Sequence, residues 1–188
     1  MPTTRFLLLC AVAVLRATPA AAQTVAPPPA AFPDAWIGVW RGTMTIYGAA
    51  DSVKQTVPVT LSIAHETPGR YRWRTVYAND TTKSMKDYHL VVLDAAAGRY
   101  ATDENNGLLI DEQYIGGMLI SVFQVGEQML ENRYAMHGDS LVQDLVFWKN
   151  TAVRTTGGTG PNGERGTPVM GFRVGGRQRV VLLRDASR

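Results

Sequence analysis

Hydrophobic and polar residues alternate along most of the chain after residue 36. In residues 53–63, Val57, Val59, Leu61 and Ile63 share one face of an extended chain, and Lys, Thr and Ser residues occupy the other. Residues 70–77 repeat the pattern, with aromatic side chains opposite three arginines. A period of two is typical of antiparallel strands that have one apolar and one polar face. The pattern therefore predicts a protein built mainly from β-strands.

Turn sequences separate the alternating runs at short intervals, among them TPG from residue 67 and HGD from residue 137. No stretch has the apolar spacing of an amphipathic helix of about a dozen residues. Strands are expected near residues 36–48, 52–65, 70–78, 83–94, 98–103, 107–114, 118–125, 128–137, 140–150 and 170–184. Consecutive hairpins favour a single antiparallel up-and-down β-barrel of about 8–10 strands, which leaves no free sheet edge. A β-sandwich would produce nearly the same pattern.

The first 22 residues have the organisation of a signal peptide. Arg5 precedes a short apolar run from Phe6 to Leu15, and small residues up to Ala22 provide a cleavage site. The apolar run is shorter than the roughly 20 residues of a membrane-spanning helix. We therefore expect export to the periplasm or the outside of the cell, with a membrane encountered only while the signal peptide passes through it.

The remainder of the chain is expected to form one domain. Residues 23–34 are rich in proline and alanine and predict an extended tether. Residues 35–188 contain no internal repeat or second change of composition, so they are assigned to one barrel domain. The oligomeric state is left open.

Charge and cysteine content exclude several classes of function. Cleavage removes Arg5 and Arg16, which lowers the net charge from +3 to +1, so no nucleic-acid partner is expected. The single cysteine, Cys10, also lies in the signal peptide, so the exported chain would have neither a disulfide nor a thiol nucleophile.

Residues 35–42, AWIGVWRG, carry a resemblance to a known family. Gly38 and Trp40 form a G-x-W sequence that resembles the start of the first strand in lipocalins and related calycin barrels, and WIGVWRG is similar to the nitrobindin and fatty-acid-binding-like branches. This resemblance implies a calycin-type barrel in which Trp40 fills the closed end. It also implies that an arginine from the last strand lies across the indole; Arg184 is the first candidate and Arg179 the second.

The resemblance does not extend to a haem site. Nitrobindin-like barrels hold haem through a late histidine, whereas no histidine follows His137 in this chain. The three histidines lack the spacing of a zinc site. We therefore expect no metal and no cofactor.

Aromatic and methionine side chains are the main candidates for a ligand site. The residues expected to contact a ligand are Tyr71, Trp73, Tyr77, Met118, Phe123, Tyr134 and Met136. Such side chains suit an adaptable apolar cavity with a few hydrogen-bonding groups. The leading hypothesis is an exported barrel that binds a small, largely hydrophobic ligand in its interior. It remains open whether these side chains line a cavity or simply fill the core.

An enzyme of isomerase, cyclase or lyase type, without a cofactor, is the alternative. No G-x-S-x-G motif is present, but acid–base chemistry on a hydrophobic substrate leaves no motif. Asp87 and His89 are the candidate base and its orienting partner, with Tyr71 or Tyr134 as hydrogen-bond donor. This requires Asp87 and His89 to face the cavity, although the opposite face of their strand is equally apolar. Whether the protein is an enzyme stays undecided.

Two further features lie outside these hypotheses. Asp111 and Glu112 adjoin an apolar run and could place one acid inside the barrel, as a structural group or a ligand anchor. Residues 157–166, GGTGPNGERG, contain G-x-G-x-x-G without the strand and helix of a dinucleotide site, so a mobile hairpin loop is expected. Whether this loop covers the barrel as a lid is left open.

Overall fold

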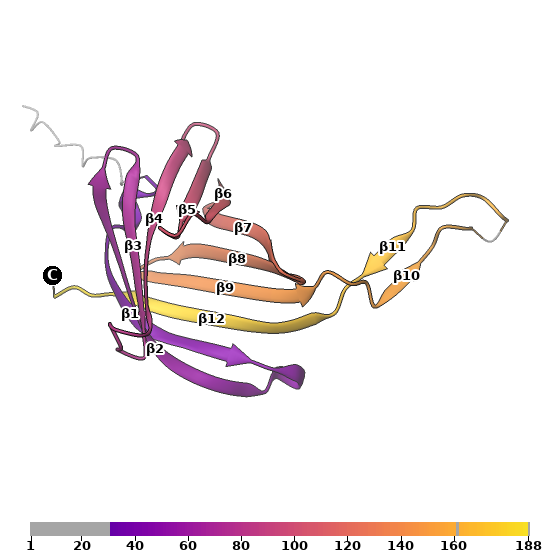
Figure 1. Cartoon of the computed structure of the whole chain (residues 1–188), viewed down its shortest axis with the longest axis horizontal. Helices are drawn as coiled ribbons and strands as arrows, with labels where there is room; N and C mark the ends of the chain where they lie inside the picture. Colours follow the sequence, from indigo (N-terminus) through magenta and orange to yellow (C-terminus); the bar gives the residue numbers. More distant parts are fainter. Residues whose placement is uncertain (1–30, 161, 188) are drawn as a thin grey trace, which may run out of the picture.

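The protein forms a closed antiparallel β-barrel of ten strands (Figure 1). The computed structural model describes residues 31–160 and 162–187, so the predicted signal peptide and most of the predicted tether lie outside the described residues. The barrel strands are β1 (Gly38–Tyr47), β2 (Val53–Thr67), β3 (Arg70–Tyr77), β4 (Met85–Asp94), β5 (Arg99–Asp103), β6 (Leu109–Ile115), β7 (Met118–Val125), β8 (Gln128–His137), β9 (Ser140–Lys149) and β12 (Val174–Arg184). The prediction of an all-β antiparallel barrel is confirmed.

The barrel closes through its first and last strands. From β1 to β9 each strand pairs with its successor, and β12 then pairs with both β9 and β1. Trp40 on β1 lies opposite Arg184 on β12, at the end where β1 begins and β12 finishes. We call this the closed end. No helix in the described residues is long and apolar enough to cross a membrane.

A second, two-stranded sheet extends from the barrel. It consists of β10 (Arg154–Thr156) and β11 (Val169–Gly171), which pair with each other. We call residues 150–173, which connect β9 to β12, the arm. The expected last strand, near 170–184, is therefore divided into β11 and β12. Figure 1 shows the arm pointing away from the barrel, so its glycine-rich tip does not cover the barrel in this structure.

Side chains from alternate positions fill the closed end. Val57, Val59, Leu61 and Ile63 on β2 are buried, as their alternation predicts. Val59, Leu61 and Ile63 pack with Trp36, Trp40, Tyr71, Trp73, Leu90, Tyr100, Leu119, Leu141, Val180 and Leu182. Trp36 itself lies in a short 3-10 turn, η1 (Asp34–Trp36), rather than in the first strand.

The end of the predicted tether contributes to this core. Phe32 stacks on Tyr114, with ring centroids 4.2 Å apart, and meets Trp36 and Tyr100 edge-on. Asp34 accepts a hydrogen bond of 2.8 Å from the Tyr71 hydroxyl. Residues 32–34 thus pack on the closed end.

Trp40 and Arg184 form the plug of the closed end. Trp40 is fully buried, and its indole N–H donates a 2.9 Å hydrogen bond to the Trp36 carbonyl. The Arg184 guanidinium lies 4.1 Å from the centre of the Trp40 ring. It donates hydrogen bonds of 2.6 Å to the Ile37 carbonyl and 2.8 Å to the Ala35 carbonyl. A cation above an indole face gains from the ring quadrupole as well as from these bonds.

Arg179, the second candidate for this role, lies elsewhere. It donates a 3.0 Å hydrogen bond to Asp144, which also accepts one from Arg177. These side chains line a depression together with Arg133 and His137, away from Trp40. Arg179 is an odd number of residues from Arg184, so the pleat of β12 directs the two side chains to opposite faces.

Candidate functional site

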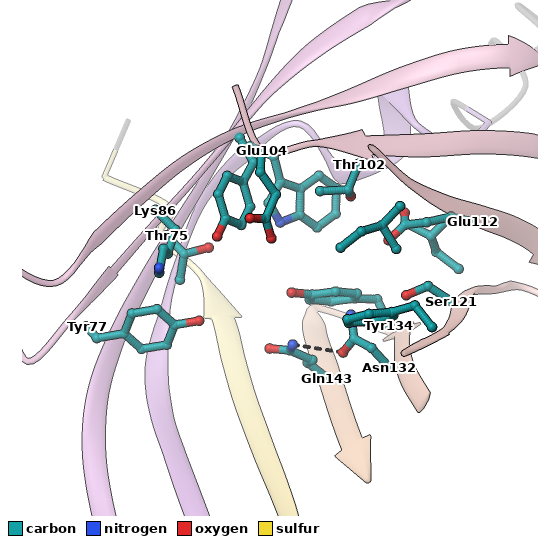
Figure 2. A pocket seen from close by; sticks show the side chains of 15 residues that line it. Thr75, Tyr77, Lys86, Thr102, Glu104, Glu112, Ser121, Asn132, Tyr134 and Gln143 are labelled. Carbon is teal, nitrogen blue, oxygen red and sulfur yellow. Dashed lines mark hydrogen bonds between the residues drawn. The ribbon is translucent and has the colours of Figure 1, made fainter. Parts of the chain in front are cut away.

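A cavity of about 130 Å³ lies between the inner faces of β3 to β9 (Figure 2). It is lined by Trp73, Thr75, Tyr77, Lys86, Tyr88, Thr102, Glu104, Ile110, Glu112, Leu119, Ser121, Phe123, Asn132, Tyr134 and Gln143. Figure 2 shows Glu112 and Ser121 on one side of it and Tyr77 and Lys86 on the other, with Tyr134 between them. Polar and apolar groups therefore share one cavity, which is partly open to solvent.

Strand alternation explains how these side chains converge. Ile110 and Glu112 are two residues apart on β6, and Leu119, Ser121 and Phe123 alternate on β7, so each set points to the same face. The outward neighbour Val122 is 58 % exposed, whereas Ser121 is 3 % exposed. The chain thus places polar side chains at inward positions that a simple core would fill with apolar ones.

Glu112 is the most unusual group in the cavity. Its side chain is buried, with 8 % of the residue exposed, and Oε2 has no hydrogen-bond partner within the described part of the chain. Burial raises the pKa of Glu112 to about 7, and the hydroxyls of Thr102 and Ser121 offset part of that shift. A buried carboxyl oxygen without a hydrogen bond from the protein is costly, because burial penalises its charged form.

Phenol groups provide the hydrogen-bond donors of the cavity. Burial raises the pKa of Tyr134 well above its usual value and also raises that of Tyr77. The pKa of Tyr88 rises to about 12, first through burial and then through the nearby Glu104 carboxylate. All three phenols therefore stay protonated at neutral pH; that of Tyr88 donates to Glu104, whereas those of Tyr77 and Tyr134 can donate to a ligand.

An amide pair completes one wall. Gln143 on β9 donates a 2.9 Å hydrogen bond to the side-chain carbonyl of Asn132 on β8 (Figure 2). This bond orients both amides within the lining. At another part of the cavity, Lys86 is exposed and Glu104 is half-buried, so they mark its more open side.

The residues expected to contact a ligand divide into three groups. Trp73, Tyr77, Phe123 and Tyr134 line the cavity. Tyr71 and Met136 pack with the core at the closed end instead. Met118 lies in the outer depression with Arg133 and His137.

Asp87 and His89 lie on the outer face of β4, so the expected catalytic pair is not in the cavity. Asp87 accepts hydrogen bonds from Arg72 and Arg74, and this contact with Arg72, reinforced by Arg74, holds the pKa of its carboxyl well below the usual range. His89 Nε2 lies 2.9 Å from a Glu66 carboxylate oxygen, and its Nδ1 lies 2.9 Å from the Asn105 side-chain oxygen. The hypothesis of an enzyme that uses Asp87 and His89 as a catalytic pair inside the barrel is therefore corrected.

The physical reason is charge pairing across β3 and β4. Arg74 lies opposite Asp87 and Arg72 opposite His89, and directly opposite residues share a face. Because Trp73 faces inward, the adjacent arginines face outward and hold Asp87 there. Tyr88 then points into the cavity.

Sequence reasoning missed most of the polar lining. The sequence marks Glu112 only as one of two adjacent acids, and no pattern in it distinguishes Thr102, Ser121, Asn132 or Gln143. The sequence does carry one signal for Glu112: it lies two residues from both Ile110 and Tyr114, so the three side chains share one face of the strand. Single polar residues at inward positions otherwise look like breaks in the alternation.

Comparison of the sequence with models of protein families finds no match, and a search of curated proteins finds none either. The function must therefore be argued from the geometry and chemistry of the cavity.

Proposed function

We propose that this protein is a small-molecule-binding barrel of calycin type and that its ligand occupies the cavity between β3 and β9. The observation that supports this most is the cavity lined by aromatic rings, a hydrogen-bonded amide pair and a buried carboxyl with an unpartnered oxygen. Ligand sites combine an apolar lining with a few placed polar groups in this way.

The size of the cavity limits the ligand. Its volume of about 130 Å³ is close to the roughly 150 Å³ of a cavity that accommodates benzene, and well below the roughly 300–1,000 Å³ of pockets for larger ligands. A molecule of one ring or a short branched chain fits, whereas a long fatty acid would need the barrel to expand. The expected ligand is therefore a small hydrophobic molecule that also carries a hydrogen-bonding group.

The cost of burying Glu112 argues for a bound partner. A core that served stability alone would place an apolar residue at this position, because an unsatisfied buried polar group destabilises a fold by about 1–3 kcal/mol. A ligand that donates a hydrogen bond to Oε2 would recover that cost. The arrangement is therefore typical of a binding site whose polar groups lower the stability of the fold when no ligand is bound.

The sequence extends the proposal to location. The signal-peptide pattern of residues 1–22 supports binding in the periplasm or outside the cell, after cleavage near Ala22. The G-x-W start and the arginine over Trp40 support the calycin assignment.

A pair of adjacent substitutions on β7 tests the site. Ser121→Leu adds a side chain that fills part of the cavity, whereas Val122→Leu makes a similar change on the outer face. Ligand-observed NMR with a panel of one-ring alcohols, amines, acids and amides should detect binders of the wild-type protein. We expect Ser121→Leu to lose that binding and Val122→Leu to retain it.

Circular dichroism separates loss of the site from loss of the fold, since overpacking costs about 1–3 kcal/mol and leaves a stable barrel folded. Equal binding by the wild type and a folded Ser121→Leu variant would contradict this location. A panel that yields no binder to the wild type would overturn the proposed function.

A further inference from the structure

The geometry points to a small organic cation with an ammonium group as the ligand of the cavity, with Glu112 as its anchor. This inference rests on the proposed function and names the chemical class of the ligand. It starts from the one buried polar atom in the cavity lining that has no partner, Oε2 of Glu112. A carboxylate accepts hydrogen bonds, so the missing group is a donor, and an ammonium donates while also neutralising the buried charge.

The aromatic lining favours a cation over a neutral donor. Five rings surround the space, those of Trp73, Tyr77, Tyr88, Phe123 and Tyr134. Trp73 and Tyr134 meet edge-on, with centroids 5.3 Å apart, so the two rings are held at a fixed angle to one another. Aromatic faces attract cations, and this attraction strengthens when water is excluded. A carboxyl among several rings thus supplies both kinds of contact that an ammonium uses.

The charged groups of the cavity lining also favour a cationic ligand. The lining contains two carboxyl groups, Glu104 and Glu112, and one ammonium, Lys86. Lys86 is exposed and Glu112 is buried on the other side of the cavity in Figure 2, so they do not neutralise each other directly. When Glu112 is ionised, an anionic ligand near it would meet a buried like charge, and no attraction would offset the cost of removing the anion from water.

Protonation of Glu112 makes the proposal measurable. The empty site favours a neutral carboxyl because burial raises its pKa to about 7. A cation requires the ionised form, so binding below pH 7 must release a proton. The affinity for a cation is then expected to fall by about tenfold for each pH unit below 7. For an anion bound to the neutral carboxyl, the trend would be the reverse.

Several other titratable groups lie near the site, and the phenols among them do not produce this trend. Those that face the cavity or lie across from Glu112 are Tyr77, Lys86, Tyr88, Tyr100, Glu104 and Tyr134. Burial raises the pKa of all four phenols, so they remain neutral between pH 5 and 8. Replacement of Glu112 by Gln then isolates its contribution from those of Lys86 and Glu104.

The test compares three probes of nearly equal size, namely benzylamine, benzyl alcohol and benzoate. Benzylamine is an ammonium and benzoate an anion throughout the pH range used. Isothermal titration calorimetry at pH 5, 6, 7 and 8 measures their affinity for the wild type, Glu112→Gln and Asp111→Asn. Asp111 is the adjacent exposed carboxyl on the outer face of β6, so its substitution is the matched control.

We expect benzylamine to bind the wild type at pH 8 at least about tenfold more tightly than benzyl alcohol, and to lose that advantage by pH 5. Glu112→Gln should remove both the preference and its pH dependence, whereas Asp111→Asn should keep both. Tighter binding of benzyl alcohol or benzoate than of benzylamine at pH 8 would overturn the cation proposal and leave the binding function intact. A benzylamine preference that survives in Glu112→Gln would overturn the role of Glu112. No binding of any probe to the wild type would count against the binding function itself.

Discussion

The plug of the closed end explains the glycines that flank Trp40. Gly38 has φ +143°, and a Cβ there would lie 2.9 Å from an Arg184 guanidinium nitrogen. At Gly42 a Cβ would collide with the backbone carbonyl of Val181 on β12. The missing side chain of Gly38 leaves space for the arginine. That of Gly42 lets β1 and β12 lie close together where the barrel closes. A G-x-W-x-G sequence is thus a packing requirement of this plug.

Replacing Arg184 by alanine should measure the strength of the plug. The variant loses the cation over Trp40 and leaves the Ile37 and Ala35 carbonyls without their donor. Because Arg184 is partly open to solvent, we expect a loss of about 2 kcal/mol in the free energy of unfolding, measured by urea titration.

Arg179→Ala provides the control on the same strand. Its partner Asp144 keeps a second arginine, Arg177, and surface ion pairs contribute about 0–1 kcal/mol. Equal stability losses in the two variants would show that Arg184 has no special role at the closed end.

Among the strands, β3 and β4 show why some inner faces were predictable and others were not. On β3 the arginines at 70, 72 and 74 share one face, so the aromatic set on the other face is expected to point to the interior. On β4 both faces carry apolar residues, so alternation alone does not show whether His89 or Tyr88 faces the interior. The choice is made by Arg72 and Arg74 on the neighbouring strand, through a cross-strand register that the sequence does not display. The cavity is harder to predict from the sequence than either strand, because its polar residues come from seven strands.

The arm should be dispensable for the barrel. Its strands β10 and β11 pair only with each other, and none of the arm residues that the structure describes belongs to the core. We expect replacement of residues 151–172 by a two-residue Asn-Gly turn to shift the melting temperature by less than about 2 °C, measured by differential scanning calorimetry.

Ligand binding by the same shortened protein tests whether the arm acts as a lid. The arm points away from the barrel, so we expect affinity for the cavity probes to stay within about twofold of the wild type. A weaker affinity with an unchanged melting temperature would show that the arm closes over the site in solution.

For the molecule as a whole, closure divides the interior into two parts with different roles. The closed end holds the most deeply buried side chains, among them Trp40, Leu61 and Leu141. The cavity between β3 and β9 instead contains the buried carboxyl and the amide pair. A ten-stranded barrel has a wider interior than one that its own side chains fill completely, which leaves room for this second part.

This division predicts how the stability of the whole protein depends on pH. Burial raises the pKa of Glu112 to about 7 in the folded protein, against an ordinary value of 4.5 in the unfolded chain, so the folded state binds the proton more tightly. The free energy of unfolding should therefore fall by about 3 kcal/mol as the pH rises from 4.5 to 7, and then level off. Glu112→Gln lacks this group, so we expect it to be more stable than the wild type at pH 8 and to lose that advantage towards pH 5. Urea titrations of both proteins at each pH measure the difference, in which the contributions of the other titrating groups cancel. A constant difference between pH 5 and 8 would show that Glu112 is not a buried carboxyl in the unliganded barrel.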